Sequence, residues 1–373
     1  MRSSNKTKDS FFALLKAGLW EQSVQLSPYE PLDFDALYQM AEDQSVVGLL
    51  AAGMEHVEDR KVTKSEAIQF LKKVFSIENR NSSMKSFIEE LVLKMRRSKI
   101  YALLVKGQGV AQCYERPLWR TPGDIDFLLD SENYERAKSF FSKVNEFDTQ
   151  EGAYTKHLGM TLDSWTVDLH GTLRSELSFR VDRGIDRIQE DSLKIGNVRT
   201  WRNGNSDVFL PDSNNDAILI FTHFLKHFYK GGTGLRQICD LCRLLWTYRD
   251  RIDTNLLKCR LQSMGLMSEW RAFAAFAVDY LGMPVDAMPL YDASARWRRK
   301  ARRICSFILE VGNFGIKRDH TYFDKYPYVI RKCISFGRRC GDVFRHVAVF
   351  PRDSLRFFPC LVFNGVRDAA RGE

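Results

Sequence analysis

The sequence predicts an α+β protein in which a mixed-sheet core is flanked by helical regions on both sides. Apolar residues recur with helical spacing near the N-terminus, short apolar runs typical of strands follow, and helical spacing then returns. We therefore divide the chain into an N-terminal helical region (1–98), a mixed core (99–211) and a C-terminal helical region (212–373). Hydrophobic residues make up 44% and charged residues 28% of the chain, a balance that excludes wholesale disorder.

Three stretches of the N-terminal region are predicted to be helical. Ser10 can cap a helix over Phe11–Trp20, Asp33–Glu42 has helical spacing, and Lys64–Arg97 contains neither glycine nor proline. No apolar stretch reaches the ~20 residues that a bilayer-spanning helix needs. The first residues also lack the apolar segment and cleavage site of a signal peptide, so we expect a soluble, cytoplasmic protein.

The core is predicted from short apolar runs bounded by turn residues. The expected strand segments are Ile100–Val105, Asp124–Leu129, Tyr154–Leu158, Trp165–His170, Leu193–Trp201 and Val208–Leu210. Asn203-Gly204 marks a turn between the last two. A helix from about Glu132 to Val144, capped by Ser131, is expected after the second strand.

The C-terminal region again has helical spacing. The expected helices are Asn215–Tyr229, Leu235–Arg249, Leu256–Gln262, Ser268–Leu281 and Ala295–Glu310. Cys239 and Cys242 form a CxxC on one helical face, and without a second CxxC we interpret them as buried thiols rather than zinc ligands. Arg236 and Asp240 have the spacing of an ion pair within the same helix.

The net charge of +9 is concentrated near the C-terminus. Residues 291–373 contain 18 Lys and Arg against 8 Asp and Glu, which leaves 38 against 39 in the rest of the chain. The basic clusters are Arg296–Arg303 and Arg338-Arg339. They could contact nucleic acid, a nucleotide or an acidic membrane surface. We favour solvated faces of packed helices, because no known nucleic-acid-binding module accompanies them.

Three aspartates form the candidate catalytic group. Asp124 and Asp126 are two residues apart on a predicted strand, so both carboxylates project to the same side. Two close carboxylates favour a shared cation, and magnesium binds such groups together with substrate phosphates. Alone, this pair would more often be a surface feature. Asp168, on another predicted strand, is a candidate to converge with them.

A glycine-containing turn provides a candidate phosphate-binding segment. Lys106, Gly107, Gln108 and Gly109 follow a buried strand and open a short helix. Glycine allows close backbone approach, and a helix N-terminus offers free N–H groups to phosphate oxygens. Lys106 and Arg120 could pair with the carboxylates or with phosphate. An ordinary strand-to-helix turn is the alternative.

Four histidines are candidates for the acceptor side of the site. His157 precedes Asp168 on a probable strand, and His170 lies two residues after Asp168 on the same strand face. His223 and His227 have the spacing of the HExxH zinc motif, but the position of its glutamate is not acidic, which argues against zinc hydrolysis. Hydrogen-bonded structural histidines are the alternative in each case.

Together these features resemble the DNA-polymerase-β-like nucleotidyltransferase superfamily, and most closely the uncharacterised nucleotidyltransferase family often found in Bacteroidetes. The segments that carry the resemblance are Phe11–Trp20, Leu104–Gly107, Arg120–Asp126, Val167–His170 and Gly234–Asp240. Many members have Gly-Ser or Gly-Gly in the turn, whereas this chain has Gly107-Gln108. A serine hydroxyl for the phosphate is therefore missing.

The resemblance implies a magnesium-dependent enzyme, with manganese as an alternative cofactor. Asp124 and Asp126 would hold the magnesium of a nucleoside triphosphate, and all three aspartates would hold a second ion that activates an acceptor hydroxyl. Asp168 would lie nearest that hydroxyl. Two such ions clamp the attacking and leaving oxygens of an in-line displacement, here at the α-phosphate with release of pyrophosphate. The implied partners are an NTP and an unidentified hydroxyl-bearing acceptor; nucleic acid is open but not favoured.

Two rival functions remain open from the sequence. One is a nucleotide- or RNA-binding module that uses the same site with little turnover, which the basic C-terminal region supports. The other is transfer of the γ-phosphoryl group by the same ligands. Like charges gathered without a cation destabilise a fold, so the three acids favour chemistry over binding alone.

Overall fold

Four short strands form the mixed sheet of the core, and the α+β prediction is confirmed. The strands are β1 (Leu103–Val105), β2 (Ile125–Leu128), β3 (His157–Leu162) and β4 (Trp165–His170), in the order β1-β2-β4-β3. β2 and β4 are parallel, and the two outer pairs are antiparallel. The computed structural model describes residues 2–143, 146–149, 151, 154–317, 330, 334, 337, 341–342, 344–347 and 349–370.

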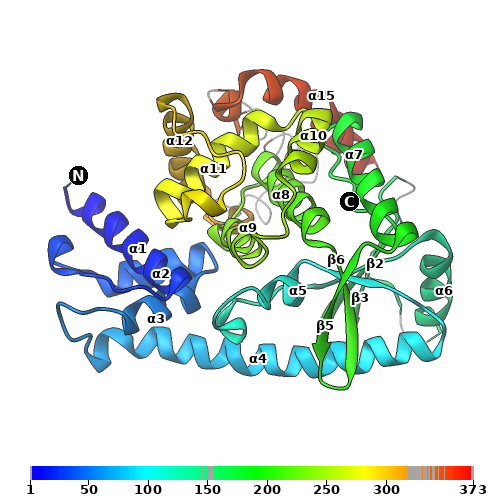
Figure 1. Ribbon diagram of the computed structural model, residues 1–373, viewed down its shortest axis with the longest axis horizontal. Helices are drawn as coiled ribbons and strands as arrows, with labels where there is room; N and C mark the ends of the chain where they lie inside the picture. The colour runs from blue at the N-terminus through cyan, green and yellow to red at the C-terminus, as the bar shows by residue number, and fades with distance from the viewer. Residues whose placement is uncertain are drawn as a thin grey trace.

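Side-chain alternation gives this sheet one apolar and one polar face. Phe127, Val167 and Leu169 are fully buried on the apolar face, where they share a core with α4 (Lys64–Arg97) and α6 (Ser131–Phe141). Figure 1 shows α4 running along the lower edge of the molecule, beneath both the N-terminal helices and the sheet. The polar face is thereby left to line a cavity.

A separate hairpin lies beside β1 and α4. Its strands are β5 (Val198–Asn203) and β6 (Ser206–Pro211), which pair antiparallel. Gly204 in the predicted turn has φ +56°, a backbone conformation that glycine adopts at no steric cost. The Asn-Gly signal therefore predicted the hairpin correctly.

The N-terminal helices α1 (Arg2–Trp20), α2 (Phe34–Asp43) and α3 (Val47–Glu55) pack against one another before α4 begins. α1 and α3 approach through glycine: a Cβ on Gly18 would lie 1.8 Å from the carbonyl oxygen of Leu49. Thr63 caps α4 in a capping box with Glu66, which explains where this long helix begins.

The C-terminal helices form the second large part of the molecule. They are α7 (Phe179–Glu190), α8 (Ser213–Lys230), α9 (Leu235–Thr247), α10 (Thr254–Met264), α11 (Met267–Leu281), α12 (Ala295–Val311) and α15 (Pro351–Ala370). Buried side chains of α1 to α3 and of α8 to α12 belong to one continuous hydrophobic core. No helix in the described part of the chain has the length and apolar character needed to cross a membrane.

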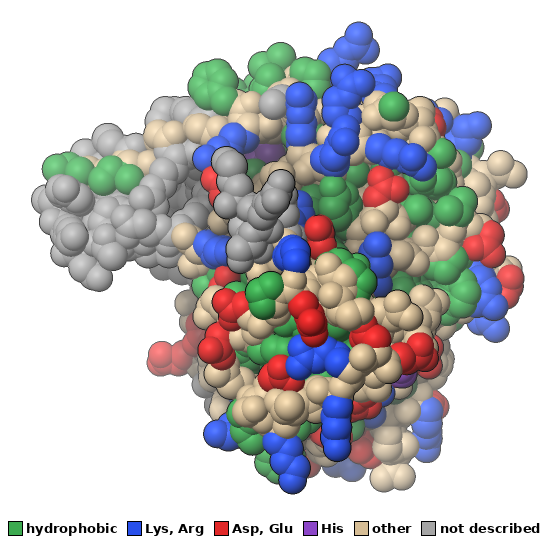
Figure 2. Space-filling view, turned by 90° about the vertical axis from the view of Figure 1, so that its left-hand side faces the viewer, with side chains coloured by type: hydrophobic (Ala, Val, Ile, Leu, Met, Phe, Trp, Pro, Cys, Tyr) green, Lys and Arg blue, Asp and Glu red, His purple; other side chains and the backbone are tan. Residues whose placement is uncertain are grey.

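Part of the basic C-terminal charge lies on an exposed helix face, a position that fits both a solvated surface and a binding surface. Arg296, Arg299 and Arg303 are exposed on α12, while Trp297 and Ile304 are buried on its opposite side. Figure 2, which views the side of the molecule that carries α1 and α12, shows Lys and Arg side chains gathered at the top. The predicted cluster Arg338-Arg339 lies outside the described residues.

Two predicted helix caps are wrong. Ser10 lies inside α1 and donates to the Thr7 carbonyl, so it is not a cap. Asp130 rather than Ser131 caps α6, because its carboxylate accepts from the Asn133 amide. The predicted end of this helix, Val144, lies outside the described residues.

The region between β4 and β5 also differs from the prediction. Asp191–Ile195 forms a π-helical turn that continues α7, so the strand expected from Leu193 begins only at Val198. α7 itself had no counterpart among the predicted helices. Cys239 and Cys242 are buried and form no disulfide in α9, so the prediction that they are buried is confirmed.

Candidate active site

A cavity of about 670 Å³ lies between the polar face of the sheet and α8, and all three aspartates line it. Asp126 and Asp168 are register partners on the parallel strands β2 and β4, so their carboxylates lie side by side on one face. Asp124 stands two residues before Asp126 and is exposed to solvent. The sheet therefore brings the candidate catalytic group together from two segments far apart in sequence.

Lys106 contacts the central aspartate from the glycine-containing turn. Its Nζ lies 3.0 Å from Oδ1 of Asp126 and 3.4 Å from Nδ1 of His223. Lys106 has φ +59°, a conformation that L-residues rarely adopt, directly before Gly107 at φ +42°. This strained turn directs the ammonium group towards the acids, and strain of this kind is concentrated at functional sites.

The pKa values of the two neighbouring aspartates move in opposite directions. Burial acts to raise the pKa of Asp126, but Lys106, a hydrogen bond from His170 and nearby His223 outweigh it and hold the pKa well below its usual range. Partial desolvation, followed by the negative charges of Asp126 and Asp168, raises the pKa of Asp124. The acids therefore lie close enough to repel one another, and a cation would relieve that repulsion.

His157 and His170 stand beside the acids on the same sheet face. They are register partners across β3 and β4, and their rings stack with centroids 4.8 Å apart. Nε2 of His170 lies 2.8 Å from Oδ1 of Asp126, and Nε2 of His157 lies 3.2 Å from Oδ1 of Asp168. Burial lowers the pKa of His170, although its hydrogen bond to Asp126 opposes that shift.

α8 forms the opposite wall of the cavity with His223, Lys226 and His227. Burial lowers the pKa of all three; the neighbouring lysines add to this and bring the pKa of His227 to about 3 and that of Lys226 to about 8. Glu176 is held more closely by Lys230, at 2.7 Å, than by Lys226, at 3.9 Å. Sequence reasoning missed Lys226, although its position three residues after His223 places both on one helix face.

The other two predicted phosphate contacts are placed differently. The Gln108 side chain is buried and donates to Oδ1 of Asn81, 2.7 Å away on α4, so only its backbone is near the turn. Arg120 lines the cavity but forms a buried bidentate pair with Asp240, with both nitrogen–oxygen distances 2.7 Å. Its guanidinium therefore links this loop to α9, and the two nitrogens that pair with Asp240 are not available to bind a phosphate.

The expected ion pair between Arg236 and Asp240 within α9 is wrong. Asp240 instead pairs with Arg120, and Nη1 of Arg236 donates to the carbonyl oxygens of Thr121 and Pro122 at 3.0 and 2.9 Å. Helix α9 thus holds the turn that leads directly into the first aspartate. The i, i+4 spacing could not reveal this, because both partners come from a distant loop.

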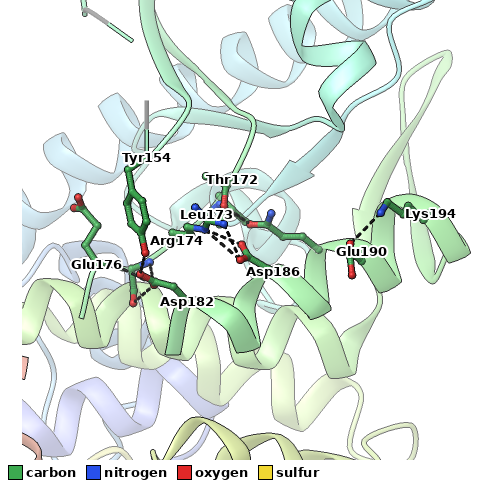
Figure 3. A network of polar contacts seen from close by, with 11 residues as sticks. Tyr154, Thr172, Leu173, Arg174, Glu176, Asp182, Asp186, Glu190 and Lys194 are labelled. Atoms are coloured by element: carbon green, nitrogen blue, oxygen red, sulfur yellow. Dashed lines mark hydrogen bonds and ion pairs between the residues drawn. The ribbon is translucent and has the colours of Figure 1, made fainter. Parts of the chain in front are cut away.

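A segment following β4 forms the rim of the cavity and was also missed. Asp182 of α7 accepts hydrogen bonds from the Ser175 amide at 2.7 Å, the Ser175 hydroxyl at 2.9 Å and the Glu176 amide at 3.1 Å. Tyr154 donates to its other oxygen at 2.8 Å, and Arg174 pairs with Asp186 (Figure 3). Residues 172–176 are therefore fixed onto α7 and line the cavity.

Gly159 is a further residue that the sequence did not identify. It is the register partner of Asp168 on β3, and a Cβ at this position would lie 2.9 Å from Oδ1 of Asp168. That distance is shorter than real Cβ contacts allow. Glycine here leaves room for the carboxylate beside the strand.

The donor set suits a divalent cation. Three carboxylates face one cavity, and Mg²⁺ prefers oxygen ligands, often one or two carboxylates completed by substrate phosphates. Asp124, Asp126 and Asp168 are therefore the residues that would hold it. Among the described residues, one group of three possible metal ligands has its ligand atoms all within 4.8 Å of one another. This group consists of His157, Asp168 and His170.

Comparison with known proteins gives one positive result. A protein-family model described as "Uncharacterised nucleotidyltransferase" matches residues 30–282, which include the sheet, α8, α9 and every residue of the cavity wall named above. Comparisons with curated proteins and with solved structures found no match.

Proposed function

The chain belongs to the uncharacterised nucleotidyltransferase family, and on that premise we propose that it moves a nucleoside monophosphate from an NTP to an acceptor hydroxyl in a Mg²⁺-dependent reaction. Pyrophosphate is the second product. The observation that carries the proposal is the pairing of Asp126 with Asp168 across β2 and β4, with Asp124 beside them in the same cavity.

Each acidic residue has a distinct part in the proposed reaction. Bound Mg²⁺ would neutralise the phosphates and lower the pKa of the attacking hydroxyl. Asp124 and Asp126 would hold the ion of the nucleotide, and Asp168 would help to hold the ion at the acceptor. Asp168 would also accept the acceptor proton, since it is the acid farthest along the sheet towards β3 and His157.

The cationic groups of the cavity would bind the triphosphate. Lys106 lies between the sheet and α8, and Lys226 faces the cavity from α8. Gly107 has no side chain to obstruct a phosphate that approaches the turn. Lysine binds phosphate as a point charge, whereas arginine can bind it through two parallel hydrogen bonds. Arg120 is already paired with Asp240, so the lysines are the cations left to bind the triphosphate.

Incubation with α-labelled and γ-labelled NTPs, Mg²⁺ and cell extract tests the proposal. Wild type should transfer the α-label but not the γ-label, and D126N or D168N should lower transfer by at least about 100-fold, as expected when charge stabilisation is removed from a transition state. D163N is the matched control, since Asp163 is exposed in the β3–β4 turn. Circular dichroism should show that all variants remain folded.

The same experiment separates the rival functions. Transfer of the γ-label would show that the same acids support transfer of the γ-phosphoryl group instead of the nucleoside monophosphate. Nucleotide binding with no labelled product in any extract would favour a binding module. Equal transfer by wild type and D126N would overturn the assignment of this site.

A further inference from the structure

We propose that His157, Asp168 and His170 form a mixed nitrogen–oxygen site that binds a first-row transition-metal ion, such as Zn²⁺, in preference to Mg²⁺. This rests on the proposed function in one respect, because Asp168 is shared and the ion would occupy the acceptor-side cation position. It goes further by assigning two histidines as ligands and by naming the class of metal.

The sheet itself creates the cluster. His157 and His170 are directly opposite each other on the antiparallel strands β3 and β4, and Asp168 lies two residues before His170 on the same face. One ligand atom from each residue lies within 4.8 Å of the other two. Three donors on the rigid backbone of two paired strands need little reorganisation to meet at one ion.

The observed distances match those between neighbouring ligands of one metal ion. Metal–nitrogen and metal–oxygen bonds are about 2.0–2.2 Å, which places adjacent donors roughly 3 Å apart. Nε2 of His157 is 3.2 Å from Oδ1 of Asp168, and Nε2 of His170 is 2.8 Å from Oδ1 of Asp126. His157 and Asp168 could therefore bind one ion without displacement of the strands.

The nitrogen donors determine which metals the site favours. Magnesium strongly prefers oxygen, whereas imidazole suits zinc, copper, iron and nickel. Affinity for nitrogen-containing sites rises along the first-row series from Mn²⁺, the weakest binder, to Cu²⁺, so Mn²⁺ serves here as a spectroscopic probe rather than as the preferred metal. Two histidines with one carboxylate, and Asp126 adjacent as a further oxygen donor, therefore discriminate against Mg²⁺. Asp124 and Asp126 alone would leave an all-oxygen position for the nucleotide-bound ion.

The site is open on one side and supported on the other. The exposed fractions of the His157, Asp168 and His170 side chains are 33%, 17% and 14%, and all three residues line the cavity. A bound ion would keep coordination positions directed towards a substrate, as catalytic metal sites do. Gly159 leaves the space in which the Asp168 oxygen sits.

Pulsed EPR of Mn²⁺ added to the nucleotide-free protein tests the inference without any enzymatic assay. Wild type should show ¹⁴N couplings from imidazole, and these should weaken in H157Q or H170Q and disappear in the double variant. Titration calorimetry with Mn²⁺, Zn²⁺ and Mg²⁺ should show a loss of about tenfold or more in Mn²⁺ affinity in each single variant. Mg²⁺ affinity should change little.

H56Q is the matched control. His56 also pairs with a carboxylate, that of Glu21 at 2.7 Å, but it does not line the cavity. Its substitution should leave both the ¹⁴N couplings and the Mn²⁺ affinity unchanged. Thermal unfolding of each variant without metal would show whether a lost signal reflects lost folding.

The outcome separates this inference from the proposed function. Oxygen-only coordination of Mn²⁺, or unchanged Mn²⁺ affinity in folded H157Q and H170Q, would overturn the mixed site. The transfer of the α-label with Mg²⁺ tests the proposed function independently of that result. Histidine-coordinated Mn²⁺ in a protein that transfers no label from any NTP would support the site and overturn the nucleotidyl-transfer proposal.

Discussion

At the scale of single residues, Gly159 offers a direct test of how precisely Asp168 must be placed. Because a Cβ would lie 2.9 Å from Oδ1 of Asp168, G159A should displace the carboxylate from its register with Asp126. We expect transfer to fall by about 10- to 100-fold, since misplacement by ~1 Å can have this effect. Steady-state kinetics and circular dichroism measure the loss and the retained fold.

G231A is the control for that substitution. Gly231 has nothing within 4 Å of its ideal Cβ, so the added methyl group meets no other atom. It should therefore behave like wild type. Unchanged activity in G159A would show that the Asp168 carboxylate does not need its observed position.

Lys226 predicts a pH dependence for nucleotide binding. Burial, and next the neighbouring Lys230, lower its pKa to about 8, so its charge is present below that pH and is lost above it. If Lys226 binds phosphate, kcat/KM for the NTP should fall by about tenfold as pH rises from 7 to 9, the worth of one charged hydrogen bond. K226R stays charged and should flatten this profile. An identical profile in both proteins would exclude this role.

At the scale of elements, the fixed rim of residues 172–176 depends on α7 through Asp182. D182A removes the acceptor for the Ser175 and Glu176 amides and should lower the free energy of unfolding by about 1–3 kcal/mol. Because this segment lines the cavity, KM for the acceptor or the NTP should rise as well. Denaturant unfolding and steady-state kinetics measure the two effects.

E190A is the matched control on the same helix. Glu190 pairs with Lys194 on the surface, where an ion pair contributes little stability. It should change neither stability nor KM. If D182A lost stability but kept both KM values, the rim would have only a structural role.

The sequence predicted the parts of this site that depend on local alternation, and missed those that depend on tertiary contacts. The i, i+2 spacing of Asp124 and Asp126 was sufficient to place both on one side of a strand. Asp168 could be proposed for the same face, but its pairing with Asp126 depends on strand order, which a single sequence does not encode locally. Arg120 was expected to meet phosphate, because its buried partner, Asp240, lies on a helix far along the chain.

Whole helices were predicted with similar limits. α8, α9 and α11 have continuous apolar stripes and were expected near their observed bounds. α7 was missed although it anchors the rim, because its apolar residues are few and its sequence lies between strand signals. The N-cap of α6 was placed one residue late, since Asp130 and Ser131 are both good caps and only the backbone decides between them.

At the scale of the whole molecule, α8 links the candidate active site to the helical core. One side of α8 presents His223 and Lys226 to the cavity, while Phe224 and Phe228 are fully buried among the helices. The position of the cavity wall therefore depends on the packing of the C-terminal helices. A substitution that loosens the packing of that core should therefore also displace the cavity wall, because α8 belongs to both.

Glu269 makes the stability of this core depend on pH. It is completely buried on α11, accepts one hydrogen bond from Tyr229 of α8, and its Oε2 has no partner among the described residues. Burial, and next the negative charge of Asp353, raise its pKa from 4.5 to about 8. The folded state therefore retains a proton that the unfolded chain releases, and stability should decline as pH rises from about 4.5 to about 8.

E269Q removes this titration and tests the prediction. The free energy of unfolding of wild type should fall by a few kcal/mol relative to E269Q between pH 5 and pH 9, since each unit of pKa shift corresponds to about 1.4 kcal/mol. E90Q is the control, because Glu90 is exposed on α4 and not part of the buried core. Denaturant unfolding at the two pH values measures the difference. If the free energy of unfolding had the same pH dependence in wild type and E269Q, Glu269 would not hold its proton in the folded protein. The carboxylate of Glu269 would then be stabilised in the core by contacts to Tyr229 and other neighbouring residues.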